Sequence, residues 1–372
     1  MAEQKLNIVM FGHKRIPSRE GGIEIVVEEL ATRMVEHGHQ VTVLNRSGKH
    51  VSGAEVKKVS EYKGVHVKTV ATIDKKGLAA MTSSFTAAVK AAVSKADVVH
   101  IHAEGPAAMS WIPKLAGKRV ICTIHGLDWA RAKWGGFATK YIKWGEKQAV
   151  KHADEIIVLS RGVQEYFKTT YNRDTVFIPN GVSRPEPRHV NEIKKMWGLE
   201  KNSYVLFLGR IVPEKGLRYL VEAWKGINTD KKLVIAGGSS DTEAFMNELK
   251  AAVGDDVIFT GFQQGRVLEE LYSNAYIYTL PSDLEGMPLS LLEAMSYGNC
   301  CLVSDIPECA EVIEDKAVVF PKGNVEELRK TLQGLLDEPD KVQKYKCEAA
   351  DFICQKYNWD DVVERTLEIY RG

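Results

Sequence analysis

The sequence predicts an α/β protein made of two Rossmann-like, doubly wound domains. Short apolar runs alternate with stretches of helical periodicity along nearly the whole chain, which is typical of buried parallel strands joined by helices. A proline-rich polar stretch at 183–189 interrupts this alternation, which then starts again. The length of 372 residues is enough for two such domains, each with its own core.

The apolar runs of the first half are expected to form strands of one parallel sheet, at 7–11, 40–44, 97–101, 119–123 and 155–159. A helix is expected at 24–37, and Gly38 is placed to end it. The second half is expected to supply strands at 204–208, 232–236, 257–259 and 275–280. Ligands of doubly wound sheets bind beyond the carboxyl ends of the strands, so we expect the site in a central cleft between the two domains.

Composition excludes several classes of protein. The formal net charge of +1 gives no general affinity for nucleic acid. The six cysteines form no Cys-x-x-Cys pair and no histidine cluster stands beside them, which argues against zinc and favours free thiols in a reducing compartment. No signal peptide and no apolar run of about 20 residues is seen. We therefore expect a cytoplasmic protein, or one at the inner face of the plasma membrane.

The most informative segment carries two acids around the start of a helix. Glu285 precedes Gly286, Met287, Pro288 and Leu289, and Glu293 follows. Pro288 suits the first helical position and Gly298 suits the helix end. Such a helix start offers N–H groups and positive partial charge to a phosphate. Glu293 lies about 7.5 Å further along the axis than Pro288, a layout that suits a nucleotide-sugar, although a loop acid and a helix-surface acid without a role remain the alternative.

Two further loops follow predicted strands. Gly209, Arg210 and Lys215 follow the strand at 204–208, where two cations suit the charge of a diphosphate leaving group; solvated loop charges are the alternative. Gly21 and Gly22 follow the first strand and allow a ligand to approach the backbone closely, although a flexible turn would use the same residues. The absence of a G-x-G-x-x-G pattern weakens a dinucleotide interpretation.

The acid–seven residues–acid spacing resembles that of the family-4 glycosyltransferases, retaining enzymes with the GT-B fold. The Gly-Arg and Lys-Gly pairs around Arg210 and Lys215 resemble the second signature of that family. The resemblance covers nearly the whole chain. It implies that Glu285 holds the transferred sugar, that Glu293 holds the ribose, and that Gly21 and Gly22 touch the donor diphosphate.

The resemblance also implies roles for residues at other strand ends. His125, followed by Gly126, would face the transferred sugar near the reacting carbon, whereas a lone histidine at a strand end is otherwise only hydrogen-bonded. Asp128 would bind the acceptor or simply cap a turn. The positions at which the family places the base and ribose of the donor are Gly237, Gly261 and Phe262.

The resemblance implies an organisation into three segments. An acceptor domain would span 1–183, a nucleotide-sugar domain 184–355, and a last helix at 356–372 would cross back to the first domain near Trp359. The N-terminal motifs look like those of a bacterial subgroup associated with rhamnosyl and related transfers in surface polysaccharides.

The chemistry that we expect needs no cofactor and no metal. No Asp-x-Asp stands at a strand end, so the charge of the leaving group would fall to Arg210, Lys215 and helix dipoles. No carboxylate nucleophile is evident beside His125. The resemblance implies a front-face route instead, in which the acceptor hydroxyl attacks from the side that the diphosphate leaves and Glu285 orients the sugar.

The acceptor side is expected around 131–151. A helical pattern aligns Phe137, Tyr141 and Trp144 beside a stripe of lysines, and Arg131, Lys133 and Trp134 stand just upstream. The stripe consists of Lys140, Lys143, Lys147 and Lys151. Such a helix can lie on an anionic membrane near a lipid-linked acceptor. The alternative is an aromatic face turned to the core with a solvated basic edge.

Two other functions stay open at this stage. One is a different GT-B enzyme, such as a nucleotide-sugar epimerase or a phosphorylase. An epimerase would need no acceptor, and an assay with the donor alone would identify it. A non-catalytic nucleotide-sugar sensor is the other, and it would not need the two cations of Arg210 and Lys215 together with Glu285 and Glu293.

Overall fold

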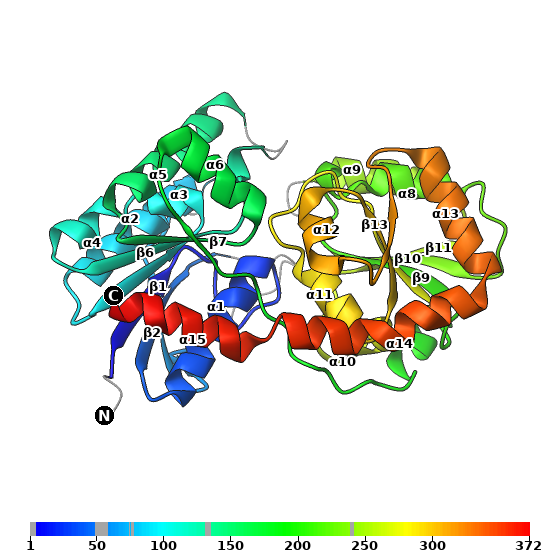
Figure 1. Cartoon of the computed structure of the whole chain (residues 1–372), viewed down its shortest axis with the longest axis horizontal. Coiled ribbons are helices and arrows are strands. Elements are labelled where there is room, and N and C mark those ends of the chain that lie inside the picture. The colour runs from blue at the N-terminus through cyan, green and yellow to red at the C-terminus, as the bar shows by residue number, and fades with distance from the viewer. Residues whose placement is uncertain (1–4, 49–58, 74, 76–77, 131–134, 239–241) are drawn as a thin grey trace. The chain divides into compact units, whose positions relative to one another are not determined.

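The computed structural model describes residues 5–48, 59–73, 75, 78–130, 135–238 and 242–372. The chain divides into two compact units (Figure 1). Unit 1 contains Met1–Asn180 and Trp359–Gly372, and unit 2 contains Gly181–Asn358. The boundaries predicted at 183 and 355 differ slightly from these, because Val182 and Asn358 form a bridge inside unit 2 and the Val182 N–H donates to the Tyr357 carbonyl at 2.8 Å.

The described part of unit 1 forms an eight-stranded sheet of order β3-β4-β2-β1-β5-β6-β7-β8, parallel except where β3 meets β4. Its strands are β1 (Asn7–Phe11), β2 (Gln40–Arg46), β3 (Glu61–Tyr62), β4 (Val65–Val70), β5 (Val98–His102), β6 (Arg119–Ile124), β7 (Glu155–Val158) and β8 (Val176–Phe177). The five strands predicted for this half are confirmed. The short strands β3 and β8 carry too few residues for a pattern to predict them.

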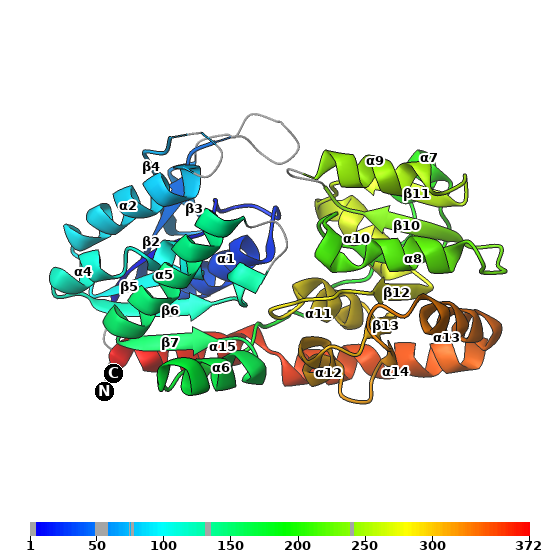
Figure 2. The ribbon, with the colours of Figure 1, turned by 90° about the horizontal axis from the view of Figure 1, so that it is seen from above.

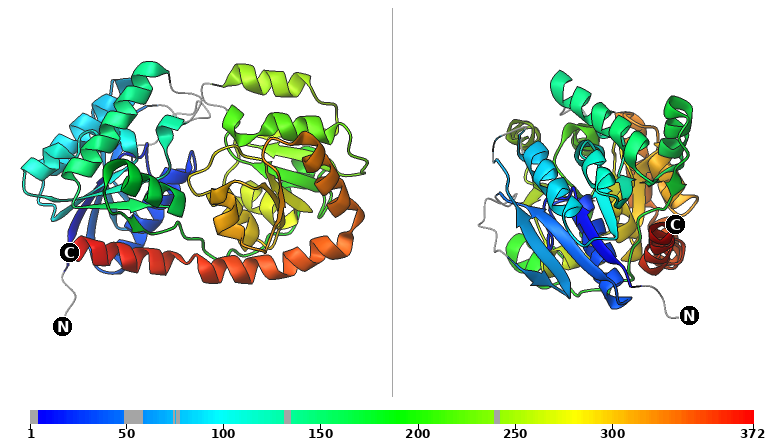
Figure 3. Two further views of the ribbon diagram at one scale, coloured as in Figure 1. Left: turned by 45° about the horizontal axis from the view of Figure 1, so that its top comes forward. Right: turned by 90° about the vertical axis from the view of Figure 1, so that its left-hand side faces the viewer.

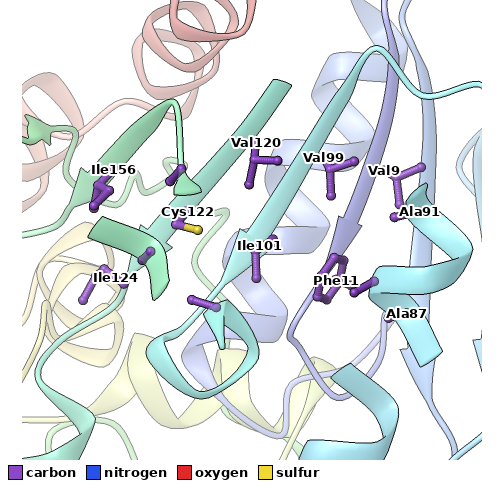
Figure 4. Close-up of a cluster of buried hydrophobic side chains, with 14 of the residues drawn as sticks. Val9, Phe11, Ala87, Ala91, Val99, Ile101, Val120, Cys122, Ile124 and Ile156 are labelled. Carbon is purple, nitrogen blue, oxygen red and sulfur yellow. The ribbon is translucent and has the colours of Figure 1, made fainter. Parts of the chain in front are cut away.

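Helices lie against the unit 1 sheet (Figure 3). They are α1 (Gly22–Glu36), α2 (Leu78–Ala92), α3 (Glu104–Ala107), α4 (Trp111–Leu115), α5 (Gly136–His152), α6 (Arg161–Tyr171) and α15 (Trp359–Arg371). Small side chains on α2 allow it to approach the sheet closely, and Ala87 and Ala91 join Phe11 and Ile101 in the core (Figure 4). Because strand side chains alternate, His100 faces the other side, where it meets Tyr370 of α15.

The described part of unit 2 forms a six-stranded parallel sheet of order β11-β10-β9-β12-β13-β14 (Figure 2). Its strands are β9 (Tyr204–Leu208), β10 (Lys232–Ala236), β11 (Val257–Gly261), β12 (Ile277–Leu280), β13 (Cys300–Ser304) and β14 (Val318–Phe320). The four predicted strands are present. The chain winds outward from β9 in one direction and from β12 in the other, so the loops after these two neighbouring strands meet at a switch point, where doubly wound sheets bind ligands.

The helices of unit 2 are α7 (Glu192–Trp197), α8 (Leu217–Trp224), α9 (Glu243–Ala251), α10 (Gly265–Asn274), α11 (Leu289–Ser296), α12 (Pro307–Ile313), α13 (Val325–Asp337) and α14 (Pro339–Lys356). The prediction that Pro288 is the first helical residue was wrong by one position. Pro288 is the N-cap of α11, with φ −77° and ψ 95°, which is extended backbone. The predicted end of α11 is confirmed, because Gly298 lies at φ +74° just after it.

Candidate active site

Two charged side chains meet at the switch point of unit 2, although they are 70 positions apart in the chain. Lys215 ends the short helix η2 (Pro213–Lys215) after β9, and Glu285 lies in the loop between β12 and α11. Lys215 Nζ is 2.6 Å from Glu285 Oε1, and the two side chains are only 11% and 8% exposed. The Ser282 hydroxyl donates to the same Glu285 oxygen at 2.6 Å. The pair is therefore shielded from water, and salt screens it weakly.

The loop after β9 and the loop after β12 are held together by their backbones. Gly216 adopts φ +67°, and a Cβ there would collide with the Pro281 carbonyl oxygen. The Asp283 N–H also donates to the Glu214 carbonyl at 2.9 Å. Only glycine allows this approach, so Gly216 is what brings Lys215 against the residues that precede Glu285.

The ends of β9, β10 and β11 form a row of glycines beside Arg210. The Gly209 N–H donates to Ala236, and the Gly237 N–H donates to Gly261 at 2.9 Å. Gly237 packs on the Gly209 carbonyl so closely that a Cβ would collide with it. The space beside Gly261 is open with respect to the described residues, since none of them except its two chain neighbours has an atom within 4 Å of the position of a Cβ. The structure thus brings these predicted residues to one edge, with Arg210 and Phe262 half-buried there.

The segment between Glu285 and Glu293 is fixed by buried side chains and by two tyrosine hydroxyls. Met287, Pro288 and Leu289 are buried, so their side chains hold the turn in place, and the backbone of Gly286 is buried with them. The Tyr272 hydroxyl donates to Glu293 Oε2 at 3.1 Å, and Tyr278 bonds the Ser290 hydroxyl at 2.9 Å. Glu293 is half-buried on α11. Sequence reasoning missed Ser282, Tyr272 and Tyr278, whose contacts depend on strand order.

A carboxylate on the first turn of α1, which the sequence prediction gave no role, folds back onto the loop after β1. Gly21 is the extended N-cap of α1, and Gly22 is its first residue. Glu24 Oε1 accepts a hydrogen bond from the Lys14 N–H at 2.8 Å, and a Cβ on Gly21 would lie 2.6 Å from Glu24 Oε2. The side-chain carboxylate of Glu24 thus occupies the space beside the helix start. The contact of Gly21 and Gly22 with a diphosphate stays a prediction.

His125 is the half-buried residue that follows β6 in unit 1. Its Nε2 lies 3.1 Å from Nδ1 of His102, the fully buried last residue of β5. Burial lowers the pKa of His102 well below its ordinary value and the pKa of His100 to about 3. Sequence reasoning missed His102, although its place at the end of the strand next to β6 was a usable signal.

Asp128 begins the short helix η1 (Asp128–Ala130), and its backbone is bonded to the buried acid Glu104. Its N–H donates to Glu104 Oε2 at 2.8 Å. Burial, and then the neighbouring carboxyls of Asp128 and Glu146, raise the pKa of Glu104 to about 10, so Glu104 is protonated at neutral pH. Sequence reasoning missed both buried acids; Glu146 stands on the apolar face of α5 beside Ile142 and Ala149.

The other face of α5 is exposed, which contradicts the core-facing alternative for two of its aromatic residues. Phe137 is 76% exposed and Trp144 is 41% exposed. Lys143 Nζ lies 4.1 Å from the centre of the Trp129 ring, within the range of a cation–π contact. The exposed lysines of this face are Lys140, Lys143, Lys147 and Lys151. Arg131, Lys133 and Trp134 lie outside the described residues.

Two kinds of feature are absent from the described residues, metal clusters and membrane spans. Within them, no group of three or more His, Cys, Asp or Glu side chains is arranged to hold a metal ion. None of the described helices combines the length and apolar character that crossing a bilayer requires. The six cysteines are free thiols, four of them buried: Cys122, Cys300, Cys301 and Cys309.

The two units and the site at the switch point define a sugar-transferring enzyme when they are compared with known proteins. Residues 20–184 match the family model described as Glycosyltransferase Family 4, and residues 190–352 match the model described as Glycosyl transferases group 1. The chain is therefore a glycosyltransferase of group 1, family-4-like, with the two-domain GT-B fold.

Individual relatives agree with this assignment. The chain is 25% identical to an uncharacterized glycosyltransferase of Methanocaldococcus jannaschii over 98% of both proteins. It is 30% identical to an Escherichia coli UDP-Gal:alpha-D-GlcNAc-diphosphoundecaprenol alpha-1,3-galactosyltransferase, over 57% of this chain and 58% of that one. The structure resembles Anabaena HepE in complex with UDP and glucose, with a TM-score of 0.81, 14% identity and 98% of both chains covered.

Proposed function

We propose that this glycosyltransferase moves a hexosyl or deoxyhexosyl group from a nucleotide-diphosphate sugar to a glycan or lipid-linked acceptor, with retention of configuration. The observation that carries the proposal is the buried contact between Lys215 and Glu285, 2.6 Å apart where the loops after β9 and β12 meet. A cation for a phosphate and an acid for a sugar hydroxyl are adjacent there, as the phosphate and the sugar are adjacent in the donor.

The donor proposal rests on the edge of the unit 2 sheet. Lys215 and Arg210 supply positive charge for the diphosphate, while Glu293 on α11 supplies an acceptor for the ribose hydroxyls. The open space beside Gly261 suits the nucleoside. Two of the proteins compared above support this donor class, because the name of the Escherichia coli relative includes UDP-Gal and HepE is described with UDP and glucose.

The proposed chemistry is a front-face substitution. The bond between the anomeric carbon and the leaving phosphate oxygen breaks, and the acceptor oxygen forms its bond to the same face. The proton of the acceptor hydroxyl passes to an oxygen of the leaving diphosphate. Lys215 and Arg210 stabilise the charge that develops on that group, so the reaction needs no divalent metal. Glu285 orients the sugar, and the role that we assign to His125 is a hydrogen bond to the same sugar.

The acceptor proposal rests on α5. Its exposed face combines Phe137 and Trp144 with four exposed lysines, which suits an anionic membrane surface. The name of the Escherichia coli relative includes a diphosphoundecaprenol acceptor. We infer that the protein works in the cytoplasm at the inner face of the plasma membrane, in surface-polysaccharide synthesis. The motifs around Gly21 and His125 favour rhamnosyl or related transfer.

A screen of nucleotide-sugars by thermal shift, followed by transfer assays, tests the proposal. A ligand that binds the folded state raises the melting temperature by mass action. The true donor should stabilise the wild-type protein and should stabilise Lys215→Met much less. NMR of the product should then show the anomeric configuration of the donor sugar.

Three results would contradict the proposal. The first is that no nucleotide-sugar in the panel raises the melting temperature of the protein. Another is a product with inverted configuration. The third is conversion of a nucleotide-sugar in the absence of any acceptor, which would indicate an epimerase.

A further inference from the structure

A chain of contacts runs from the last helix of unit 1 to His125. The Tyr370 hydroxyl of α15 lies 2.6 Å from His100 Nδ1, and His100 Nε2 lies 2.6 Å from the Thr123 hydroxyl. The rings of His100 and His102 are 4.1 Å apart at their centres. His102 Nδ1 in turn lies 3.1 Å from His125 Nε2. Two buried histidines therefore separate the terminal helix from the histidine that follows β6.

The contact between His102 and His125 requires one donor and one acceptor. His102 is fully buried, and its Nε2 has no hydrogen-bond partner among the described residues. If His125 Nε2–H donated, His102 would carry its own proton on Nε2, where a buried N–H would be left without an acceptor. Buried N–H groups without a partner are rarer than buried acceptors without one. The geometry therefore favours donation from His102 Nδ1–H to His125 Nε2.

We propose that His102 is a positioning residue that fixes His125 as the neutral tautomer with its proton on Nδ1. The proposal rests on the proposed function for the role of His125 toward the sugar. In that role, His125 Nδ1–H donates a hydrogen bond to an oxygen of the transferred sugar and does not accept one. Thr123 and Tyr370 fix the ring of His100, and His100 in turn packs against His102.

The same contact disfavours a proton on His125 Nε2. A proton added at His125 Nε2 would face the N–H of His102, so His102 would have to shift its own proton to Nε2, where no partner is found among the described residues. The titratable groups that face His102 are His100 on the same strand, His13 after β1 and His125 itself. All three are histidines, and each of them disfavours a proton on His102. A neutral His125 avoids placing positive charge beside a sugar that becomes cationic in the transition state.

The chain contains an internal reference for the tautomer. His39 Nδ1 accepts a hydrogen bond from the Leu6 N–H at 3.1 Å, so neutral His39 must carry its proton on Nε2. NMR of the ¹⁵N-histidine-labelled protein distinguishes the two tautomers without any activity assay. At pH 7.5 we expect opposite tautomers for His125 and His39, with assignments made by His125→Gln and His39→Gln. The same tautomer at both positions would overturn the proposal.

Variants of His102 then test its effect on transfer. An asparagine amide can donate from nearly the position of Nδ1–H, whereas leucine cannot. His102→Leu should lower kcat about tenfold, the equivalent of one lost hydrogen bond, with little change in the KM of the donor. His102→Asn should restore most of the rate. If His102→Leu and His102→Asn are both folded and lose the same fraction of kcat, the proposal is overturned.

The spectroscopic and kinetic results separate this proposal from the proposed function. A wild-type protein that shows the Nδ1–H tautomer at His125 but transfers no sugar leaves the histidine contact correct and contradicts the function. A wild-type protein that transfers sugar but carries the Nε2–H tautomer at His125 contradicts only the positioning role of His102.

Discussion

Lys215 and Glu285 form a buried ion pair, with 2.6 Å between Nζ and Oε1. Sequence reasoning gave these residues separate tasks, the lysine for the diphosphate and the acid for the sugar. In the structure their charges neutralise each other. Removing one partner of a buried pair leaves an uncompensated charge and typically costs about 3–5 kcal/mol. In the proposed function, the diphosphate of the donor would offer Lys215 a second anion, and Glu285 would then be released toward the sugar.

The two acids of the donor site should have separable effects on binding. In Glu285→Gln, Lys215 loses its anionic partner, so we expect the bare nucleoside diphosphate to bind at least as tightly as in the wild type, while sugar transfer falls sharply. Glu293→Gln should weaken the same nucleotide through the ribose. Calorimetry with nucleoside diphosphate and with nucleotide-sugar measures both effects. The exposed Glu326→Gln is the control, and equal losses for both ligands in both variants would contradict the layout.

The two cations should matter for the reaction rate. Removing one preorganised charge from a leaving-group site typically costs about 2.7–4 kcal/mol in the barrier. Arg210→Ala and Lys215→Ala should therefore lower kcat by about a hundredfold or more. Arg218→Ala removes a nearby cation that pairs with Glu248 at the surface and should leave kcat unchanged. Circular dichroism checks that each variant is folded; near-normal turnover in either of the first two would refute their role.

Activity should not depend on a divalent ion. Arg210 and Lys215 supply positive charge where the diphosphate would lie, which is the task that a divalent metal would otherwise perform. We expect the initial rate of transfer to be the same after dialysis against EDTA as with added Mg²⁺ or Mn²⁺. A rate that disappears in EDTA and returns with either ion would show that the prediction is wrong.

Glu104 should make the stability of the protein fall as the pH rises. Its pKa is raised from 4.5 to about 10, so the native state holds a proton across this range that the unfolded state has released. The stabilising contribution is complete below pH 4.5 and is lost as the pH rises through 10, with a slope of up to about 1.4 kcal/mol per pH unit. Glu104→Gln stays neutral and can still accept from Asp128.

The pH prediction for Glu104 is checked by chemical denaturation of both proteins at pH 6, 7.5 and 9. The variant should gain stability relative to the wild type at each step upward, because every other titrating group is common to both. Parallel pH dependences in the two proteins would mean that Glu104 is already ionised at neutral pH.

The basic aromatic face of α5 should bind anionic lipid. Each basic residue near such a surface contributes about 1 kcal/mol, so replacing Lys140, Lys143 and Lys147 by glutamate should release the protein from vesicles that contain phosphatidylglycerol. Transfer to a short soluble acceptor should survive, and high salt should mimic the change by screening. Sedimentation with vesicles measures the binding.

A matched control for the lipid prediction lies in unit 2. Replacing the exposed Lys330, Lys341 and Lys344 by glutamate changes the net charge equally but should leave vesicle binding intact. If the wild type fails to bind anionic vesicles at low salt, the lysine stripe is only a solvated helix edge and the lipid-linked acceptor loses its main support.

The local patterns in the chain were sufficient for the fold class. Apolar runs such as 7–11 and 204–208 are short, buried on both faces and separated by helical periods, and each became a strand. Gly298 ends α11 as expected, because this helix end depends only on the left-handed conformation of Gly298 itself, at φ +74°. The prediction for Pro288 was off by one residue, since a helix start depends on the turn before it as well as on the residue type.

The sequence by itself determined the α/β architecture, the division near the linker and the loops that carry Arg210, Lys215, Glu285 and Glu293, because these follow from residue type and short-range spacing. Only the tertiary structure decided which of these side chains touch. Lys215 meets Glu285 because β9 and β12 are neighbours in the sheet. His102 meets His125 because β5 lies beside β6, and Glu24 folds back onto Lys14. Contacts between distant positions depend on strand order and close backbone packing, which no local pattern contains.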